Sequence, residues 1–392
     1  MKPAGHIELP EPMRDPAAAK LFAALDAAGI VARFVGGCVR NAVLGRGIAD
    51  IDVAVTKAPE TVMLALKAAR IKVIPTGLKH GTVTAVVDGH VFELTTLRRD
   101  VETDGRHAVV AFTDDWLEDA SRRDFTFNAM YTDRDGTLYD PFEGRADLAK
   151  HKVRFIGDAD QRIAEDRLRV LRLFRFHAWY GAPPIDGTGY EACARHAEAL
   201  GNLSGERVAK ELLRLLEAPD PADAVEAMAD AGALDHWLPE YDGTKRLRAL
   251  VAREAAPDGL RRLAALLEDG ADATAIGKRL KLSTQQSLRL DLMIAREPPV
   301  GANLRAELYR LGKTVFVDRA LLQAPGNWRE ALKLADDWTP PELPVSGADA
   351  LELGLKPGPK VGALLDAVEQ WWIAGDFTAD RDACLAELKK RA

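Results

Sequence analysis

The feature that most constrains this 392-residue chain is a β-rich run, 31–35, that ends at Gly36-Gly37, where a helical segment begins. Glycines at such a junction let backbone N–H groups at the start of a helix approach a phosphate. Arg40 lies one helical turn further on and can add a charge-assisted contact. Alone, this pattern is more often only a tight turn, so the functional interpretation depends on the residues downstream.

A pair of acids lies ten residues after Arg40, where Asp50-Ile51-Asp52 leads into the apolar run 53–55. Residues two apart on a strand point to the same face, and neighbouring carboxylates repel each other unless a cation lies between them. Two Mg²⁺ ions held in this way can activate a 3′-hydroxyl and clamp a triphosphate. A bare Asp-x-Asp is usually two solvated acids, but its position after Gly-Gly-x-x-Arg favours a magnesium site.

A third carboxylate lies on a predicted hairpin, whose two alternating segments flank Asp88-Gly89, a strong two-residue turn signal. Glu93 stands between two apolar residues of the second segment and faces away from the core side of its strand. If this strand neighbours the one that carries Asp52, Glu93 joins the acid pair. Otherwise it is an ordinary exposed glutamate.

The segment 98–107, which comes next, is charged, contains a glycine and lacks apolar periodicity. Its composition predicts a mobile loop. A loop that comes after an active-site strand can act as a lid, and a plain solvated connection fits the same composition equally well.

A second polar cluster lies within 120–130, where Arg123, Asp124 and Asn128 fall within two turns and are bracketed by apolar residues. This arrangement can present arginine to a phosphate and aspartate to a ribose hydroxyl. The alternative is a helix N-terminus with Asp124 as its capping residue, and both interpretations can hold together.

A predicted helix at 162–176 carries an arginine row beside an acid pair. Such a row is usually a solvated face. It also suits the reading of a base edge, because carboxylates accept from amino groups and arginine donates to ring nitrogens and carbonyls, or to triphosphate oxygens. The residues concerned are Glu165, Asp166, Arg169, Arg172 and Arg175.

Strand signals fade beyond about residue 155, and segments such as 206–216 show helical periodicity instead. The chain is therefore predicted to be α+β, with a mixed head followed by an all-helical body. No apolar run is long enough for a membrane span, and the N-terminus lacks the apolar stretch of a signal peptide. Three dispersed cysteines favour a reducing compartment, which we expect to be the cytoplasm.

The net charge of −7, from 53 Lys+Arg and 60 Asp+Glu, argues against a protein that coats nucleic acid over its whole surface. It leaves room for one local basic groove, because net charge is a sum over the whole chain.

Taken in order, these motifs resemble those of the class II tRNA nucleotidyltransferases, the CCA-adding enzymes, and of the related bacterial poly(A) polymerases. The resemblance covers about residues 30–215. The matching motifs are Gly-Gly-x-Val-Arg with Asp-x-Asp, Arg-Arg-Asp…Asn-Ala, the segment 140–148, Glu-Asp-x-x-Arg and the segment 203–207.

The resemblance implies a nucleotidyltransferase palm, a small mixed sheet with helices, followed by an all-helical neck, body and tail. We accordingly expect a catalytic head at 1–150 and a helical neck with the nucleotide-selecting helix at 151–240. The segment 241–392 is then the helical body and tail, which would bind RNA.

The same resemblance implies roles for individual residues. Asp50 and Asp52 would be the magnesium ligands, and Glu93 remains the candidate third catalytic carboxylate. Glu165, Asp166 and Arg169 would form an amino-acid template that accepts CTP or ATP and rejects GTP and UTP. The other expected nucleotide contacts are Gly36, Gly37, Arg40, Arg123, Asp124, Asn128, Arg172 and Arg175.

One position departs from the family pattern, since Asn41 stands where the family usually has aspartate. If that aspartate only orients Arg40 or caps the local helix, asparagine can partly replace it. If its charge matters, the geometry on the phosphate side changes.

The expected reaction is the transfer of CMP and AMP from CTP and ATP to the 3′ end of tRNA, with Mg²⁺ as cofactor and pyrophosphate as product. The alternatives are a poly(A) polymerase, a CC-adding or A-adding enzyme, and a non-catalytic tRNA-binding protein on an inactive scaffold. Asp50 and Asp52 speak against the last of these. The expected partners are tRNA, CTP and ATP, and no membrane; the oligomeric state stays open.

Overall fold

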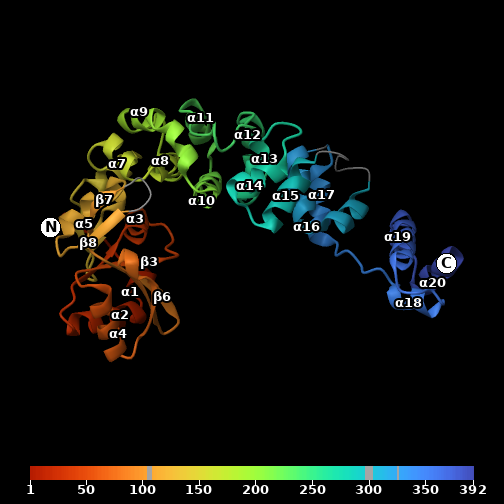
Figure 1. Ribbon diagram of the computed structural model, residues 1–392, viewed down its shortest axis with the longest axis horizontal. Coiled ribbons are helices and arrows are strands. Elements are labelled where there is room, and N and C mark those ends of the chain that lie inside the picture. Colours follow the sequence, from red (N-terminus) through yellow and green to blue (C-terminus); the bar gives the residue numbers. More distant parts are fainter. Residues whose placement is uncertain (104–107, 296–302, 325) are drawn as a thin grey trace. The chain divides into compact units, whose positions relative to one another are not determined.

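The computed structural model describes residues 1–103, 108–295, 303–324 and 326–392. It divides into two compact units, of which unit 1 comprises 1–241 with 279–281 and unit 2 comprises 242–278 with 282–392. The strands of the described residues all fall within 5–139, and the rest of their regular structure is helical (Figure 1). The predicted α+β fold is therefore confirmed, whereas the boundaries at 150 and 240 stay predictions.

Unit 1 is built on an eight-stranded mixed sheet. In chain order its strands are β1 (Gly5–His6), β2 (Ala32–Val35), β3 (Ile51–Val55), β4 (Lys72–Gly77), β5 (Thr82–Val87), β6 (His90–Thr96), β9 (Tyr131–Thr132) and β10 (Thr137–Tyr139). Their spatial order is β1-β10-β9-β2-β3-β6-β5-β4. Strands β3 and β6 run parallel, and the other neighbouring pairs run antiparallel.

The predicted hairpin is β5–β6. Its turn has positive φ at both Asp88 and Gly89, which is the conformation of a two-residue turn whose twist matches that of the strands. Strand β3 lies at the centre of the sheet, and Asp52 is its one residue that is not buried. The parallel register places Asp52 directly opposite Glu93 of β6. The strand that carries Glu93 therefore neighbours the strand that carries Asp52, as a third carboxylate at this site requires.

Short helices cover this sheet. They are α1 (Glu11–Arg14), α2 (Pro16–Ala27), α3 (Gly37–Val43), α4 (Pro59–Ala68) and the 3₁₀ turn η1 (Leu78–His80). Helix α2 is capped by Asp15, which accepts from the Ala17 N–H at 2.7 Å. Its Phe22 ring packs 4.7 Å from the Phe34 ring of β2, which fixes the helix on the sheet.

The prediction of a mobile loop at 98–107 is wrong for residues 98–103. Residues 98–103 form strand β7 (Arg98–Thr103), which pairs with β8 (Ala108–Phe112), while 104–107 lie outside the described residues. Charge and a lack of periodicity hid the strand, because its pairing with the Val-rich segment 108–112 does not show in the pattern of 98–103 itself.

The helices that complete unit 1 begin after the hairpin. They are α5 (Trp116–Ser121), η2 (Thr126–Asn128), α6 (Gly144–Ala149), α7 (Ala159–Glu165), α8 (Leu168–Tyr180), α9 (Gly187–Arg195), η3 (Ala197–Asn202), α10 (Gly205–Leu216) and α11 (Ala222–Asp230). The single helix predicted at 162–176 is in fact two, because Asp166 is extended (φ −148°, ψ 105°) and separates α7 from α8. The Asp166 carboxylate accepts from the Leu168 N–H at 3.1 Å, which stabilises the start of the second helix.

From residue 245 onward the described regular structure consists of helices. They are α12 (Lys245–Val251), α13 (Gly259–Leu266), α14 (Ala273–Leu280), α15 (Thr284–Ile294), α16 (Leu304–Gln323), α17 (Trp328–Asp337), α18 (Gly347–Glu352), α19 (Pro359–Ala374) and α20 (Arg381–Arg391). Within unit 2 the buried Asp318 of α16 accepts from Arg261 of α13 and from Arg289 of α15. One carboxylate thereby ties three helices together.

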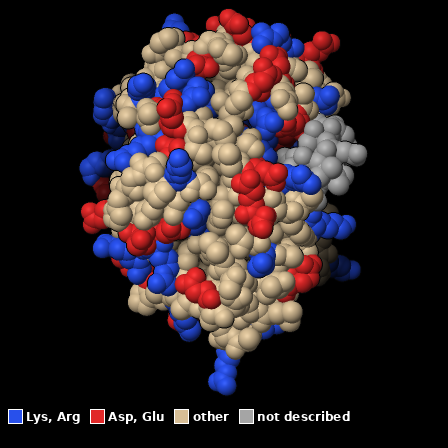
Figure 2. Space-filling view, turned by 90° about the vertical axis from the view of Figure 1, so that its left-hand side faces the viewer, with Lys and Arg blue, Asp and Glu red and all other residues tan. Residues whose placement is uncertain are grey.

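Surface charge is mixed on the face shown in Figure 2, where Lys and Arg lie interspersed with Asp and Glu. Among the described residues, none of the helices combines the length and hydropathy needed to cross a membrane. Cys38, Cys193 and Cys384 are buried free thiols.

Candidate active site

One cavity of unit 1, of about 520 Å³, brings together most of the predicted site residues. Two of them, Glu93 and Glu165, do not line it. The predicted residues that do line it are Gly36, Gly37, Arg40, Asp50, Asp52, Arg123, Asp124, Asn128, Asp166, Arg169, Arg172 and Arg175.

The two glycines form the wall at the start of α3. Gly36 has φ 71°, a conformation that side chains disfavour, so glycine is required there. A Cβ atom at Gly36 would lie 3.7 Å from Arg123 Nη1, and one at Gly37 would lie 3.7 Å from Arg40 Nη2. The backbone of this turn therefore lies directly against two guanidinium groups.

The acid pair lies beside this turn. Burial raises the pKa of Asp52 to about 6, and the carboxylates of Glu93 and Asp50 act in the same direction, while Arg123 and Arg40 oppose them. Such crowding of negative charge, on hard oxygen donors, fits a divalent cation. No group of three acidic, His or Cys side chains among the described residues is already arranged as a metal site, so the three carboxylates are adjacent but do not converge.

Arg40 carries a buried charge with neutral partners. Its Nη1 donates to Asn128 Oδ1 at 2.8 Å, its Nε and Nη2 donate to Asn41 Oδ1 at 3.2 and 3.1 Å, and its guanidinium lies 4.4 Å from the Tyr180 ring centroid. Burial lowers the pKa of Arg40. Among the described residues no carboxylate forms an ion pair with it, so its charge is available to an anionic ligand.

Asn41 makes a second contact that aspartate could not make. Its Nδ2 donates to the Gly47 carbonyl at 2.9 Å, which closes the turn that leads to Asp50. The one amide thus orients Arg40 through its oxygen and holds the turn through its nitrogen, without adding a negative charge.

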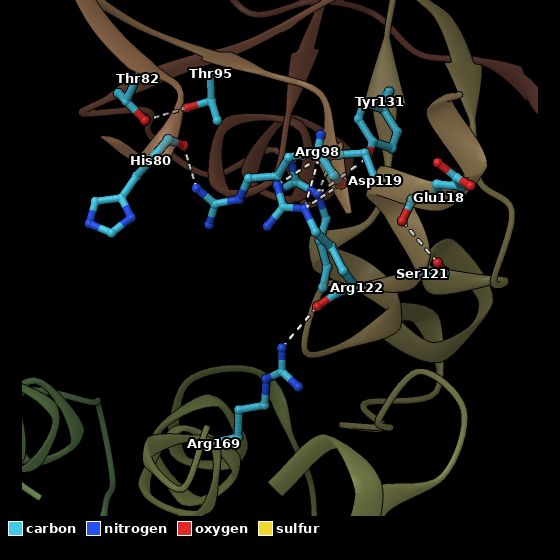
Figure 3. A network of polar contacts seen from close by, with 11 residues as sticks. His80, Thr82, Thr95, Arg98, Glu118, Asp119, Ser121, Arg122, Tyr131 and Arg169 are labelled. Atoms are coloured by element: carbon cyan, nitrogen blue, oxygen red, sulfur yellow. Dashed lines mark hydrogen bonds and ion pairs between the residues drawn. The ribbon is translucent and has the colours of Figure 1, made fainter. Parts of the chain in front are cut away.

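A carboxylate that the sequence interpretation missed, Asp119, holds the arginine pair in place (Figure 3). It is fully buried and accepts from Arg122 Nη2 at 2.6 Å, Arg123 Nη2 at 2.9 Å and the Tyr131 hydroxyl at 2.6 Å. Burial opposes its ionisation, but Arg123 and Arg122 outweigh burial and hold the pKa of Asp119 below its usual range. The signal was its spacing of three and four residues from the two arginines, a spacing at which side chains at the end of a helix can meet.

This network extends in two directions from α5. The Asp119 carboxylate accepts from the backbone N–H of Arg98 at 3.2 Å, at the base of the β7–β8 hairpin. The Arg122 carbonyl accepts from Arg169 Nη2 of α8 at 2.9 Å (Figure 3). The head and the predicted template helix are therefore joined by a direct hydrogen bond.

The arginine row of α8 is neutralised by two buried acids. Asp124 accepts from Arg172 Nε at 2.7 Å and from Asn128 Nδ2 at 3.0 Å. Burial opposes its ionisation, but Arg172 and Asn128 outweigh burial and lower the pKa of Asp124 to about 2. Glu211 of α10, also absent from the predicted set, accepts from Arg175 Nε and lies 3.8 Å from Arg172.

The three predicted template residues are arranged unequally. Arg169 and Asp166 line the cavity, whereas Glu165 lies behind Arg169 and accepts from its Nη1 at 2.6 Å. Arg207, within the predicted 203–207 motif, donates to both Asp166 oxygens, at 2.9 and 3.0 Å. Each cavity-facing template residue is thus fixed by an oppositely charged partner.

The mixed sheet, the acid pair beside the Gly-Gly turn and the arginine-lined cavity together define a nucleotidyltransferase. The family described as Poly A polymerase head domain matches residues 32–154, and the one described as probable RNA and SrmB-binding site of polymerase A matches 185–244. Nucleotidyltransferases of this kind generally use divalent metals.

Similar proteins show to which group of nucleotidyltransferases the chain belongs. Mouse mitochondrial CCA tRNA nucleotidyltransferase 1 is 36% identical over 91% of this chain and 86% of its own length. The CCA-adding enzyme of Geobacillus stearothermophilus is 33% identical over 93% and 94%. The crystal structure of the Bacillus stearothermophilus CCA-adding enzyme in complex with CTP aligns at a TM-score of 0.80 and 30% identity, covering 97% of this chain and 98% of that one. The chain belongs to the CCA-adding tRNA nucleotidyltransferases.

We predict that Asn41→Asp weakens nucleoside triphosphate binding. The new carboxylate would neutralise Arg40 and lose the hydrogen bond to the Gly47 carbonyl, so the KM for the nucleotide should rise about tenfold. Steady-state kinetics at saturating RNA measure this, with Asn41→Ala as the variant that removes both contacts without adding charge. A KM for Asn41→Asp at or below that of the unmodified protein would contradict the role given to the neutral amide.

We predict that Asp119→Asn destabilises unit 1 by about 3 kcal/mol near neutral pH, because it leaves two arginines without their shared counter-charge. Since the folded-state pKa of Asp119 is lowered, its contribution is fully present above its unfolded pKa of about 3.9 and is lost progressively as pH falls from there towards the folded-state pKa. Denaturant unfolding of both proteins from neutral pH into acid should therefore show a stability difference that shrinks below the unfolded pKa. Glu118→Gln, on the partly exposed neighbour, is the matched control; equal loss in both variants would argue against the buried-charge role.

Proposed function

We propose that this chain adds the CCA end to the 3′ terminus of tRNA, taking CMP and AMP from CTP and ATP and releasing pyrophosphate. The observation that carries the proposal is a cavity lined by Asp52, Arg40, Asp166 and Arg169, with Glu93 opposite Asp52 on the neighbouring strand. Acids for a metal and donors for a phosphate and for a base edge then lie in one place. The names of the curated relatives support the same reaction.

Asp50 and Asp52 are proposed as the ligands of Mg²⁺, with Glu93 as the neighbouring third carboxylate. The metal, when bound, lowers the pKa of the attacking 3′-hydroxyl and balances charge on the triphosphate. The raised pKa of Asp52 supports this assignment, because burial and then the carboxylates of Glu93 and Asp50 disfavour its charged form, and a bound cation would favour that form.

The arginines serve mainly to position the nucleotide. Arg40 and Arg123 present fixed positive charge along the Gly-Gly turn, where the triphosphate would lie, and Asp119 holds Arg123 in place. Groups fixed before the reaction need no reorganisation as charge moves to the leaving pyrophosphate. Arg172 and Arg175 are paired with Asp124 and Glu211 and would adjust the field around the nucleotide instead of carrying free charge.

Base selection would depend on Asp166 and Arg169. A carboxylate that accepts and a guanidinium that donates together match the edge of cytosine or adenine and mismatch guanine and uracil. Glu165 would act through Arg169 rather than touch the base, because it lies outside the cavity and accepts from the Arg169 guanidinium.

Alternative activities are separated by one assay. The protein is incubated with Mg²⁺ and with tRNA that ends before, within or after CCA, with CTP and ATP alone and together. The proposal expects growth to a complete CCA end and then arrest. Long A tails would favour a poly(A) polymerase, products that stop after CC or that add only A would favour a partial enzyme, and no extension would favour a binding protein.

A cytoplasmic location is proposed from the buried free thiols. The mouse, zebrafish and human relatives carry "mitochondrial" in their names, so the compartment of this chain needs its own measurement. Fractionation of cells that produce the untagged protein provides it.

We predict that Asp52→Asn lowers the rate of nucleotide addition by about a thousandfold, a loss of roughly 4 kcal/mol of transition-state stabilisation. Melting temperature and tRNA affinity should change little, because Asp52 is the one residue of β3 that is not buried in the sheet core. Asp26→Asn on the exposed face of α2 is the matched control. Retention of normal activity by Asp52→Asn would end the two-acid assignment.

We predict that Asp166→Ala and Arg169→Ala lower the preference for CTP and ATP over GTP and UTP by about ten- to a hundredfold, because each removes one side of the base contact. Glu165→Gln should have a smaller effect of the same kind, since it only loosens Arg169. Incorporation of each nucleotide in separate reactions gives the ratios. Unchanged selectivity in both alanine variants would rule out the template.

A further inference from the structure

A second cavity of unit 1, of about 510 Å³, plays no role in the proposed reaction. Its formally charged lining consists of Arg14, Arg46 and Arg145 against the single carboxylate of Glu8. Guanidinium groups in such excess suit a phosphate, whose oxygens accept their N–H groups in pairs.

The two cavities share one wall, formed by α3 and the turn behind it. We call the first cavity, which holds the predicted site residues, the nucleotide cavity. Asn41 and Ile48 line the nucleotide cavity, while Val43 and Arg46 line the second one. Because an extended chain spans at most about 3.6 Å per residue, the Cα atoms of Arg46 and Asp50 are no more than about 14 Å apart. The second cavity therefore lies along the same short stretch of chain as the acid pair.

Arg46 is held in place by the neck of unit 1. Its Nη1 donates to the Trp179 carbonyl at 3.1 Å, and its guanidinium carbon lies 4.9 Å from the Tyr180 ring centroid. Both contacts leave its charge without a counter-ion while they limit its motion.

Arg145 is held by a motif that the nucleotide site does not use. Asp140 accepts from the backbone N–H groups of Gly144 and Arg145 at 2.7 and 2.9 Å, which fixes the start of α6. The Arg145 side chain then extends to Gly5 of β1, where a Cβ atom would lie 3.4 Å from its Nη1. The 140–148 motif thus places an arginine at the second cavity.

These cations are not neutralised by the protein. Among the described residues, no carboxylate forms an ion pair with the side chains of Arg14, Arg46 or Arg145. Four arginines of the nucleotide cavity behave differently, since Arg123, Arg169, Arg172 and Arg175 each pair with a buried or half-buried acid. The second cavity therefore keeps an unbalanced positive charge.

We propose that this cavity is an RNA-phosphate subsite, which binds backbone phosphates of the tRNA primer just upstream of the reacting 3′ end. The inference rests on the proposed function, because it takes tRNA as the polymer that reaches Asp50. Backbone contacts carry no base information, so the subsite would hold the primers of different tRNAs alike while the nucleotide cavity selects the base.

The test is the double variant Arg14→Ala/Arg145→Ala, whose two positions lie outside the nucleotide cavity. We expect the Kd for tRNA, measured without nucleotide, to rise about tenfold and the slope of log Kd against log salt to fall by roughly one to two, as for the loss of one or two phosphate contacts. The KM for CTP at saturating tRNA should not change. Arg14→Lys/Arg145→Lys should restore part of the affinity, because a lysine still neutralises phosphate as a point charge.

The matched control is Lys67→Ala/Lys72→Ala, which removes the same formal charge from exposed positions of the head outside both cavities. An unchanged tRNA Kd in the arginine variant, or an equal loss in the lysine control, overturns the subsite. Failure of the proposed function is a separate result, since it would show as absent incorporation by the unmodified protein whatever the tRNA Kd.

Discussion

The constraint on which this site depends is the compensation of arginine charge in a small volume. Arg123, Arg169, Arg172 and Arg175 surround one cavity, and buried guanidinium groups without partners would destabilise the fold. The chain offsets this cost with acids placed behind the cavity, namely Asp119, Glu165, Asp124 and Glu211. Arg40 differs from these four, because it is buried with the amides of Asn41 and Asn128 as its partners, and its charge is therefore well suited to meet a triphosphate.

The same compensation changes the meaning of a net charge of −7. At the nucleotide cavity the acids are structural counter-ions and expected metal ligands, so they do not repel a polyanion as a uniformly acidic surface would. The second cavity shows the complementary case, with three arginines that the protein leaves unbalanced. Local arrangement, not the sum over the chain, decides where a nucleic acid can bind.

Much of the fold and of the site could be predicted from local sequence. The Gly-Gly junction and the Asp88-Gly89 hairpin depend on neighbouring residues, and the structure has both where they were expected. The Asp-x-Asp strand is confirmed only in part, because β3 begins at Ile51 and Asp50 precedes it. The supporting acids could not be found in this way, because Glu211 meets Arg175 only through the packing of α10 on α8. The break at Asp166 was hidden for a similar reason, since the apolar and arginine periodicity continues across it and only the extended backbone of one residue reveals it.

That break has a consequence for specificity. If α7 and α8 were one continuous helix, the backbone at Asp166 would be helical, and its side chain would follow the helical spacing that Glu165 and Arg169 share. The extended residue instead turns Asp166 towards Arg207 of α10, and Glu165 remains one turn before Arg169, where it can accept from the guanidinium. An acceptor and a donor for a base edge are thus fixed by two independent ion pairs. Because Arg169 also donates to the Arg122 carbonyl, the geometry of the proposed template is tied to the network of Asp119. In the proposed function, selection of the base and placement of the triphosphate would therefore depend on the same buried charge.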